Sequence, residues 1–161
     1  KVLSSMGADV RIVNKKRLGA EPAADMIVKY SKTRGITITK DMVPSIIDEL
    51  PIIFVLASLS KGITIIEGVA ELRVKETDRI VSMQNGLEAM GADFKVEGDC
   101  IVIEGRKSLR GALLKSFGDH RTCMALAVAA STAEGDSEIE GAESVSKSFP
   151  EFFDVLNKLK P

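Results

Sequence analysis

The octapeptide LEAMGADF at residues 87–94 recurs, with three substitutions, as LSSMGADV at residues 3–10. In both copies the residues before the glycine suit the last turn of a helix, and glycine commonly ends a helix. Alternating residues typical of a strand follow each copy. A second pair of similar stretches, residues 57–68 and 130–141, each combines the end of an apolar helix, a glycine stop and a strand-like run. Such repetition indicates that one supersecondary unit is used more than once.

The most complete copy of this unit predicts six elements. They are a strand near residues 36–39, a helix ending about Lys61, a strand at 63–66, a helix containing Glu76, and a hairpin of 93–96 and 100–104 that turns at Gly98-Asp99. The order is β-α-β-α-β-β. We therefore predict an α+β fold of the α/β type, built from repeated βαβαββ units.

The chain is predicted to form a single domain over residues 1–161. Residues 1–34 would be the tail of one unit, 35–106 a complete unit, and 107–161 a final unit without its last two strands. The sequence opens with Lys1 rather than Met, in what looks like the end of a helix. We therefore expect a piece of a longer protein.

Composition restricts the class of protein. With 45% hydrophobic and 28% charged residues, the chain can bury a core, and its net charge of -1, lack of Trp and single Tyr argue against nucleic-acid binding. The longest apolar stretch, residues 52–59, is too short to span a membrane, and no signal peptide precedes it. Cys100 and Cys123 lack the paired spacing of zinc or redox sites. We expect a soluble cytoplasmic protein with reduced thiols.

Residues 73–79, RVKETDR, form a charged run immediately before apolar residues at helical spacing. We predict that Lys75, Glu76 and Arg79 lie in the first turn of this helix, where free backbone N–H groups and the helix dipole favour an anion. The alternative interpretation is a solvated, well-capped helix start.

Three other predicted helix starts carry charged residues. Asp48 and Glu49 precede Pro51, which suits the first turn of a helix, and an acidic N-cap is the simpler explanation of the two carboxylates. The run GDHR at residues 118–121 contains His120, the single histidine of the chain, beside Arg121. One capping aspartate would not require these two neighbours.

The last of these helix starts is SKSFPE at residues 146–151. Ser148 and Glu151 have the spacing of a capping box. That box would leave Lys147 without a structural task.

If the units surround a pseudo-threefold axis, equivalent helix starts meet on one face. The residues expected there are Asp48, Lys75, Glu76, Arg79, Arg121 and Lys147. Four cations and two carboxylates indicate a small, multiply anionic metabolite as ligand. The chain has no Walker loop, no GxGxxG motif and no Cys or His cluster, so we expect neither a nucleotide cofactor nor a bound metal.

Four motifs resemble those of the 5-enolpyruvylshikimate-3-phosphate (EPSP) synthase family. They are IIDELP at residues 46–51, RVKETDR at 73–79, GDHR at 118–121 and KSFPEFF at 147–153, in the family's order and spacing. The resemblance covers essentially the whole chain and implies one lobe of an inside-out α/β barrel. It also implies transfer of the enolpyruvyl group of phosphoenolpyruvate to the 5-hydroxyl of 3-phosphoshikimate, with release of phosphate and no cofactor.

The resemblance assigns roles to individual residues. Asp48 resembles the residue that contacts the 5-hydroxyl and takes its proton, and Glu76 resembles the acid that protonates the methylene carbon. Lys147 resembles a catalytic lysine that also belongs to a clamp on phosphoenolpyruvate. These three are the implied catalytic residues.

The substrate-binding residues implied by the resemblance are Asp48, Lys75, Arg79, His120, Arg121 and Lys147. Lys75 is similar to a lysine shared with phosphoshikimate, and Arg79 and Arg121 are similar to clamp residues, with His120 beside them. Glyphosate is a further implied ligand, as an inhibitor whose pocket the other lobe helps to shape.

Two departures from the family pattern are informative. Glu71 stands where some members have an asparagine that touches phosphoshikimate. The N-terminal lobe, with most phosphoshikimate-binding residues, is not in this sequence. We therefore expect at most half an active site, inactive by itself.

Other functions are compatible with parts of this pattern. The sister transferase that acts on a UDP-sugar shares the fold but lacks the KETDR and DHR runs. A non-catalytic module, self-associating through strand edges, is an alternative from another class. A related RNA-end-processing fold would call for a basic nucleotide site, which a net charge of -1 opposes.

Overall fold

The computed structural model describes residues 1–159. Its elements, in chain order, are α1 (Val2–Ser5), β1 (Asp9–Leu18), β2 (Glu21–Lys29), β3 (Thr37–Ile38), η1 (Val43–Ser45), η2 (Ile47–Glu49), α2 (Leu50–Ser58), β4 (Ile63–Glu67), η3 (Ala70–Val74), α3 (Arg79–Ala89), β5 (Asp93–Glu97), β6 (Cys100–Glu104), β7 (Leu113–Lys115), α4 (His120–Thr132), β8 (Glu138–Glu140), η4 (Ala142–Lys147) and α5 (Phe152–Leu159). From β3 to β6 the order is β-α-β-α-β-β, as the sequence predicts.

The central sheet has four strands in the order β3-β4-β6-β5. β3 runs parallel to β4, while β6 runs antiparallel to both β4 and β5. Side chains alternate across this sheet, so Ile66, Phe94, Ile101 and Ile103 point into the core on one face. The rings of Phe94 and Phe54 of α2 pack edge to face, with ring centroids 5.4 Å apart.

The internal repeat is visible in the backbone hydrogen bonds. The amide of Arg34 donates to Met6 (2.9 Å), and at the equivalent place Arg110 donates to Met90 (3.0 Å). Each arginine also forms an isolated parallel bridge, Arg34 with Lys61 and Arg110 with Glu134. The next residue is a glycine in both copies, because a Cβ there would lie 2.0 Å from a backbone oxygen.

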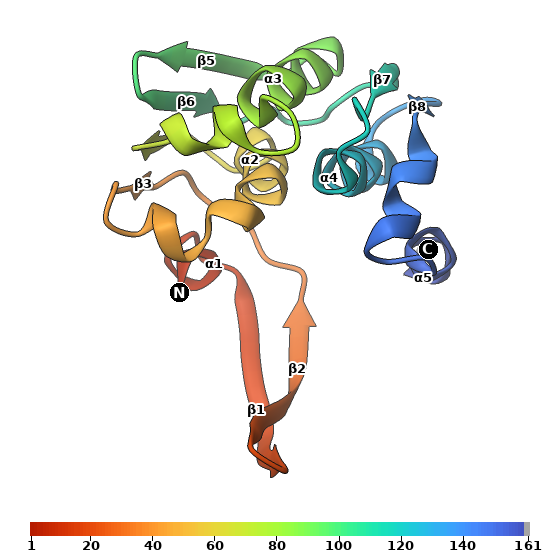
Figure 1. The fold of residues 1–161 in the computed structure, drawn as a ribbon. Coiled ribbons are helices and arrows are strands. Elements are labelled where there is room, and N and C mark those ends of the chain that lie inside the picture. Colours follow the sequence, from red (N-terminus) through yellow and green to blue (C-terminus); the bar gives the residue numbers. More distant parts are fainter. Residues whose placement is uncertain (160–161) are drawn as a thin grey trace.

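Three helices, α2, α3 and α4, pack against one another, with the central sheet on one side and the parallel pair β7–β8 on the other (Figure 1). Every residue of α4 from His120 to Ala130 is buried or half-buried. Small side chains allow this close packing, and Gly86 of α3 leaves room for Leu126 of α4. The helices therefore bring their N-terminal ends close together.

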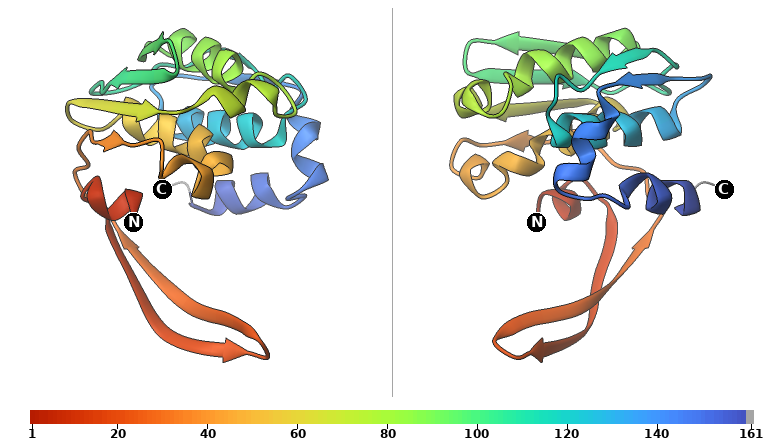
Figure 2. Two further views of the ribbon diagram at one scale, coloured as in Figure 1. Left: turned by 60° about the vertical axis from the view of Figure 1, so that its left-hand side comes forward. Right: turned by 45° about the vertical axis from the view of Figure 1, so that its right-hand side comes forward.

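The hairpin of β1 and β2 projects away from this packed body (Figures 1 and 2). Its strands pair antiparallel, with a bulge between Val13 and Lys16. Apolar side chains on the hairpin are exposed, among them Ile12 (57%) and Val28 (65%). The hairpin thus lacks the covered face that its counterpart β5–β6 has.

Two predicted helix starts differ from the structure. α3 begins at Arg79, and Asp78 is its N-cap, so Lys75 and Glu76 precede the helix rather than lying in its first turn. The capping box is wrong, because Ser148 ends η4 and α5 starts only at Phe152. Within residues 1–159, no helix has both the length and the apolar character needed to cross a bilayer.

Candidate anion-binding site

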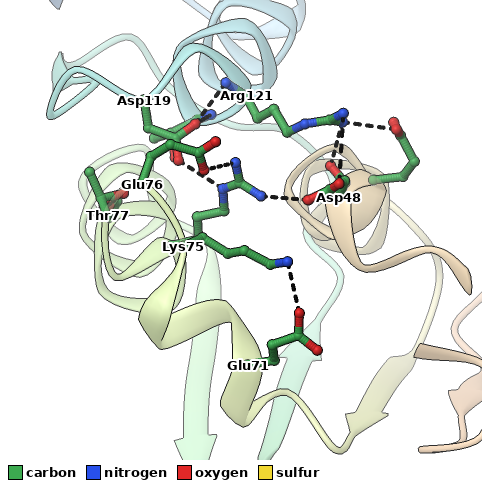
Figure 3. A network of polar contacts seen from close by, with 11 residues as sticks. Asp48, Glu71, Lys75, Glu76, Thr77, Asp119 and Arg121 are labelled. Carbon is green, nitrogen blue, oxygen red and sulfur yellow. Dashed lines mark hydrogen bonds and ion pairs between the residues drawn. The ribbon is translucent and has the colours of Figure 1, made fainter. Parts of the chain in front are cut away.

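Arg79 is the centre of the site, and Figure 3 shows three of the carboxylates of its network, Asp48, Glu76 and Asp119. Its side chain is only 1% exposed and donates to three carboxylates from three places in the chain. Nε donates to Asp119 (2.7 Å), one terminal nitrogen donates to Asp48 (2.9 Å), and the other donates to Glu76. One buried guanidinium therefore joins the starts of α2, α3 and α4.

The starts of α3 and α4 are built alike. Asp78 accepts hydrogen bonds from the amides of Ile80 and Val81. Asp119 accepts from the amides of Arg121 (2.8 Å) and Thr122 (3.2 Å) through Oδ1, and its Oδ2 accepts from Arg79. Both aspartates are N-caps, but Asp119, at 0% exposure, also holds an arginine of another helix.

The start of α2 is not an acidic cap. Glu49 occupies the N-cap position, yet it makes no side-chain capping bond. Instead, Arg121 donates to the Glu49 carboxylate (2.9 Å) and to the backbone oxygen of Asp48 (2.8 Å). The two carboxylates of this motif therefore face arginines of α3 and α4.

The electrostatics follow these contacts. The hydrogen bond from Arg79 lowers the pKa of Asp48, and the positive charges of Arg121 and Lys75 act in the same direction. Burial alone would lower the pKa of Arg79, but its bonds to Asp119 and Asp48 raise it overall. Asp48 and Arg79 therefore form a charged pair near neutral pH.

Lys75 lies outside helix α3 and pairs with Glu71 at 2.8 Å. The hydrogen bond to Glu71 raises the pKa of Lys75. Glu71 therefore supplies a carboxylate to Lys75, whose role in substrate binding stays a prediction.

The charge balance of the site differs from the prediction of four cations and two carboxylates. The structure brings together three cations, Lys75, Arg79 and Arg121, with five carboxylates, Asp48, Glu49, Glu71, Glu76 and Asp119, which gives a formal charge of -2. Each of the three cations thus already faces at least one carboxylate. Arg121, whose side chain is 30% exposed, is the more accessible of the two arginines.

The structure does not bring every predicted residue into this network. Lys147 is exposed at the end of η4, and His120 is half-buried as the first residue of α4. In the described part of the chain, neither side chain makes a hydrogen bond or ion pair with the cluster. Their assignment to the site stays a prediction.

A shallow pocket of about 190 Å³ lies beside the arginine cluster. Asp48, Glu49 and Arg121 contribute polar atoms to its wall, while Ile52 and Met124 belong to its apolar part. Among residues 1–159, no three His, Cys, Asp or Glu side chains are placed to hold a metal ion. The pocket wall thus combines one cation, Arg121, with two carboxylates and an apolar part.

Sequence reasoning missed the contributions of Glu49 and Asp119. Both residues stood in motifs that it had singled out, but each was assigned to a helix cap. The sequence signal was the second charge in each motif: Glu49 beside Asp48, and Arg121 two residues after Asp119.

The chain is similar to known proteins over nearly its whole length. Residues 1–156 match the family model described as EPSP synthase (3-phosphoshikimate 1-carboxyvinyltransferase). A 3-phosphoshikimate 1-carboxyvinyltransferase of Syntrophomonas wolfei is 46% identical over 98% of this chain and 37% of that protein. One of Roseiflexus sp. is 45% identical over 98% of this chain and 36% of its own length.

Solved structures agree with this fold. EPSP synthase from Acinetobacter baumannii superposes with a TM-score of 0.86 at 38% identity, over 99% of this chain and 38% of that one. The enolpyruvyl transferase NikO from Streptomyces tendae, at 21% identity and a TM-score of 0.71, shares the fold. The chain spans little more than a third of the length of the curated relatives it matches. By its match over residues 1–156, the chain belongs to the EPSP synthase family.

Proposed function

We propose that this chain supplies one lobe of a synthase that transfers the enolpyruvyl group of phosphoenolpyruvate to the 5-hydroxyl of 3-phosphoshikimate and releases phosphate. The observation that carries the proposal is the meeting of three helix starts at Arg79 and Arg121, within the motifs that resemble this family. The shared 3-phosphoshikimate name of the relatives favours this function over the UDP-sugar alternative.

Asp48 and Glu76 are the proposed acid–base pair. The lowered pKa of Asp48 supports an ionised carboxylate, which can accept the proton of the substrate hydroxyl. Glu76 is the proposed acid toward the methylene carbon, and its carboxylate, which Arg79 holds in this structure, must first take up the proton that it then donates. The shared arginine places the two carboxyl groups on neighbouring nitrogens of one guanidinium, so a proton acceptor and a proton donor face the same substrate.

Arg121 is the proposed first contact for the carboxylate of phosphoenolpyruvate, because it is more exposed than Arg79. Arg79 has five N–H donors, and three of them already meet carboxylates. Because the Arg79 side chain is only 1% exposed, a substrate anion reaches its two remaining donors only if Asp48 or Glu76 moves. Lys75, His120 and Lys147 complete the proposed contacts.

The second half of the site would come from the rest of a longer protein. A cluster with a charge of -2 repels a substrate with several negative charges, so additional cations are required for tight binding. We propose the N-terminal lobe as their source. We further propose cytoplasmic activity, with glyphosate as an inhibitor of the assembled site.

Phosphate release from the two substrates tests the proposal. The chain alone should release no phosphate, while the chain mixed with the complementary lobe of a related synthase should do so. The same mixture made with Arg121→Ala serves as the control and should lose this activity. A mixture that associates but stays inactive with the wild-type chain would contradict the proposal.

A self-associating module remains a second candidate, because the hairpin exposes Ile12, Met26 and Val28. Size-exclusion chromatography with light scattering distinguishes the two. A monomer at all concentrations would argue against self-association. A wild-type dimer that becomes a monomer in the Val28→Lys variant would support it.

A further inference from the structure

We propose that Asp119 is a positioning residue that sets the orientation of the Arg79 guanidinium. The two carboxylate oxygens of Asp119 have different partners. Oδ1 caps α4, and Oδ2 accepts a hydrogen bond from Arg79 Nε at 2.7 Å. Because backbone amides of α4 fix Oδ1, the position of Oδ2 is fixed too, and it can hold the guanidinium of Arg79 in one orientation. The significance for substrate binding depends on the proposed function.

Burial strengthens the contact between Asp119 and Arg79. Asp119 is 0% and Arg79 is 1% exposed, so water does not compete for the Nε–H bond. The opposite edge of the guanidinium points to Asp48 and Glu76, whose side chains are 49% and 53% exposed. Asp119 thus anchors Arg79 through Nε, while the two terminal nitrogens of Arg79 meet the more exposed carboxylates of Asp48 and Glu76.

Asp78 provides a matched comparison within the chain. It caps α3 with the same pair of backbone bonds, but its other oxygen meets Arg73 at 3.1 Å. That arginine is 42% and Asp78 33% exposed. Asp78 therefore has the capping function without the buried arginine.

Replacement of aspartate by asparagine separates the two functions. Asparagine is as good an N-cap as aspartate, so Asp119→Asn and Asp78→Asn can both keep their helix starts. At residue 119, however, the side-chain amide nitrogen would face Arg79 Nε, and two donors cannot share a hydrogen bond. If the side chain turns over to accept from Arg79, the cap of α4 is lost instead.

The Nε–H signal of Arg79 in ¹H–¹⁵N spectra of the ligand-free chain is the direct readout. Arg79→Lys, which removes this group, assigns the signal. We expect slow exchange with solvent in the wild type and in Asp78→Asn, and exchange at least about tenfold faster in Asp119→Asn. An unchanged exchange rate in Asp119→Asn would overturn the proposal.

A second variant guards against loss of folding. Asp119→Ser retains a capping oxygen but offers Arg79 no carboxylate, and it avoids the clash of donors. It should also speed the exchange while the helical circular dichroism signal persists. If neither variant folds, the wild-type spectrum decides, since an Arg79 Nε–H that exchanges as fast as exposed arginines would contradict the proposal.

The affinity for phosphoenolpyruvate then tests whether the orientation of Arg79 matters for ligand binding. Its dissociation constant should rise about tenfold in Asp119→Asn and stay unchanged in Asp78→Asn. Wild-type chain that binds no phosphoenolpyruvate, even with the complementary lobe, would count against the proposed function while the exchange result stands. Equal dissociation constants in wild type and Asp119→Asn, with faster exchange, would restrict Asp119 to a structural role and overturn its role in positioning for substrate.

Discussion

The starts of α3 and α4 share one local design but differ in what surrounds their arginines. An aspartate caps each helix, and an arginine follows in the first turn. Arg79 is 1% exposed and bonded to three carboxylates, whereas Arg121 is 30% exposed and meets Glu49 at the surface. Burial, rather than residue type, thus separates a structural centre from a contact available to ligand.

The largest expected difference is in stability. Arg79→Ala leaves Asp119 buried without its partner, and we expect the free energy of unfolding to fall by about 3–5 kcal/mol. Arg121→Ala removes partly exposed contacts and should cost at most about 1 kcal/mol. Urea unfolding followed by circular dichroism measures both. Similar losses in the two variants would show that burial does not distinguish these arginines.

Ligand binding should depend strongly on Arg121, although its removal costs little stability. Arg121→Ala should raise the dissociation constant for phosphoenolpyruvate at least about tenfold, because charged hydrogen bonds contribute this much. Its helical circular dichroism signal should stay intact. Loss of the fold in Arg121→Ala would instead make Arg121 structural and remove the contrast with Arg79.

Removing a competing carboxylate should strengthen binding modestly. Glu71→Gln removes the negative charge that pairs with Lys75 and makes the site less negative, so we expect phosphoenolpyruvate to bind about threefold more tightly. Glu21→Gln, on the projecting hairpin, changes the net charge equally and serves as the control. Equal effects of the two variants would mean that only the overall charge matters.

The smallest expected effect concerns acid stability. Because the pKa of Asp48 is lowered in the folded chain, its ion pair stabilises the fold above the unfolded pKa of about 4, and this contribution disappears as the pH falls through the lower folded value. Asp48→Asn should therefore lose less stability than the wild type between about pH 5 and pH 2. Urea midpoints across this range measure the difference, with Asp25→Asn on the hairpin as control. Parallel curves for Asp48→Asn and wild type would contradict the assignment.

Local patterns predicted much of the fold. The repeated glycine-ended motif and the alternation at residues 93–104 gave the order of elements, because helix stops and strand alternation depend on neighbours in sequence. The start of α3 was wrong by a few residues, since Asp78 accepts two backbone bonds and so fixes the cap after Lys75 and Glu76. The charged residues of the run 73–79 did not indicate by themselves which of them begins the helix.

The pairing within the site was less predictable. Arg79 meets Asp48 and Asp119 across separations of 31 and 40 residues, and Arg121 meets Glu49 across 72. No local pattern specifies which carboxylate faces which arginine at such distances. Sequence therefore identified the helix starts that converge, but underestimated how many carboxylates they bring together.

An NMR titration of the chain with phosphoenolpyruvate, with and without 3-phosphoshikimate, tests the central claim that these helix starts form a preformed half-site. We predict weak, saturable shifts confined to amides at the starts of α2, α3 and α4, largest near Arg121 and absent in Arg121→Ala. A folded chain that shows no saturable shifts there would contradict a preformed half-site.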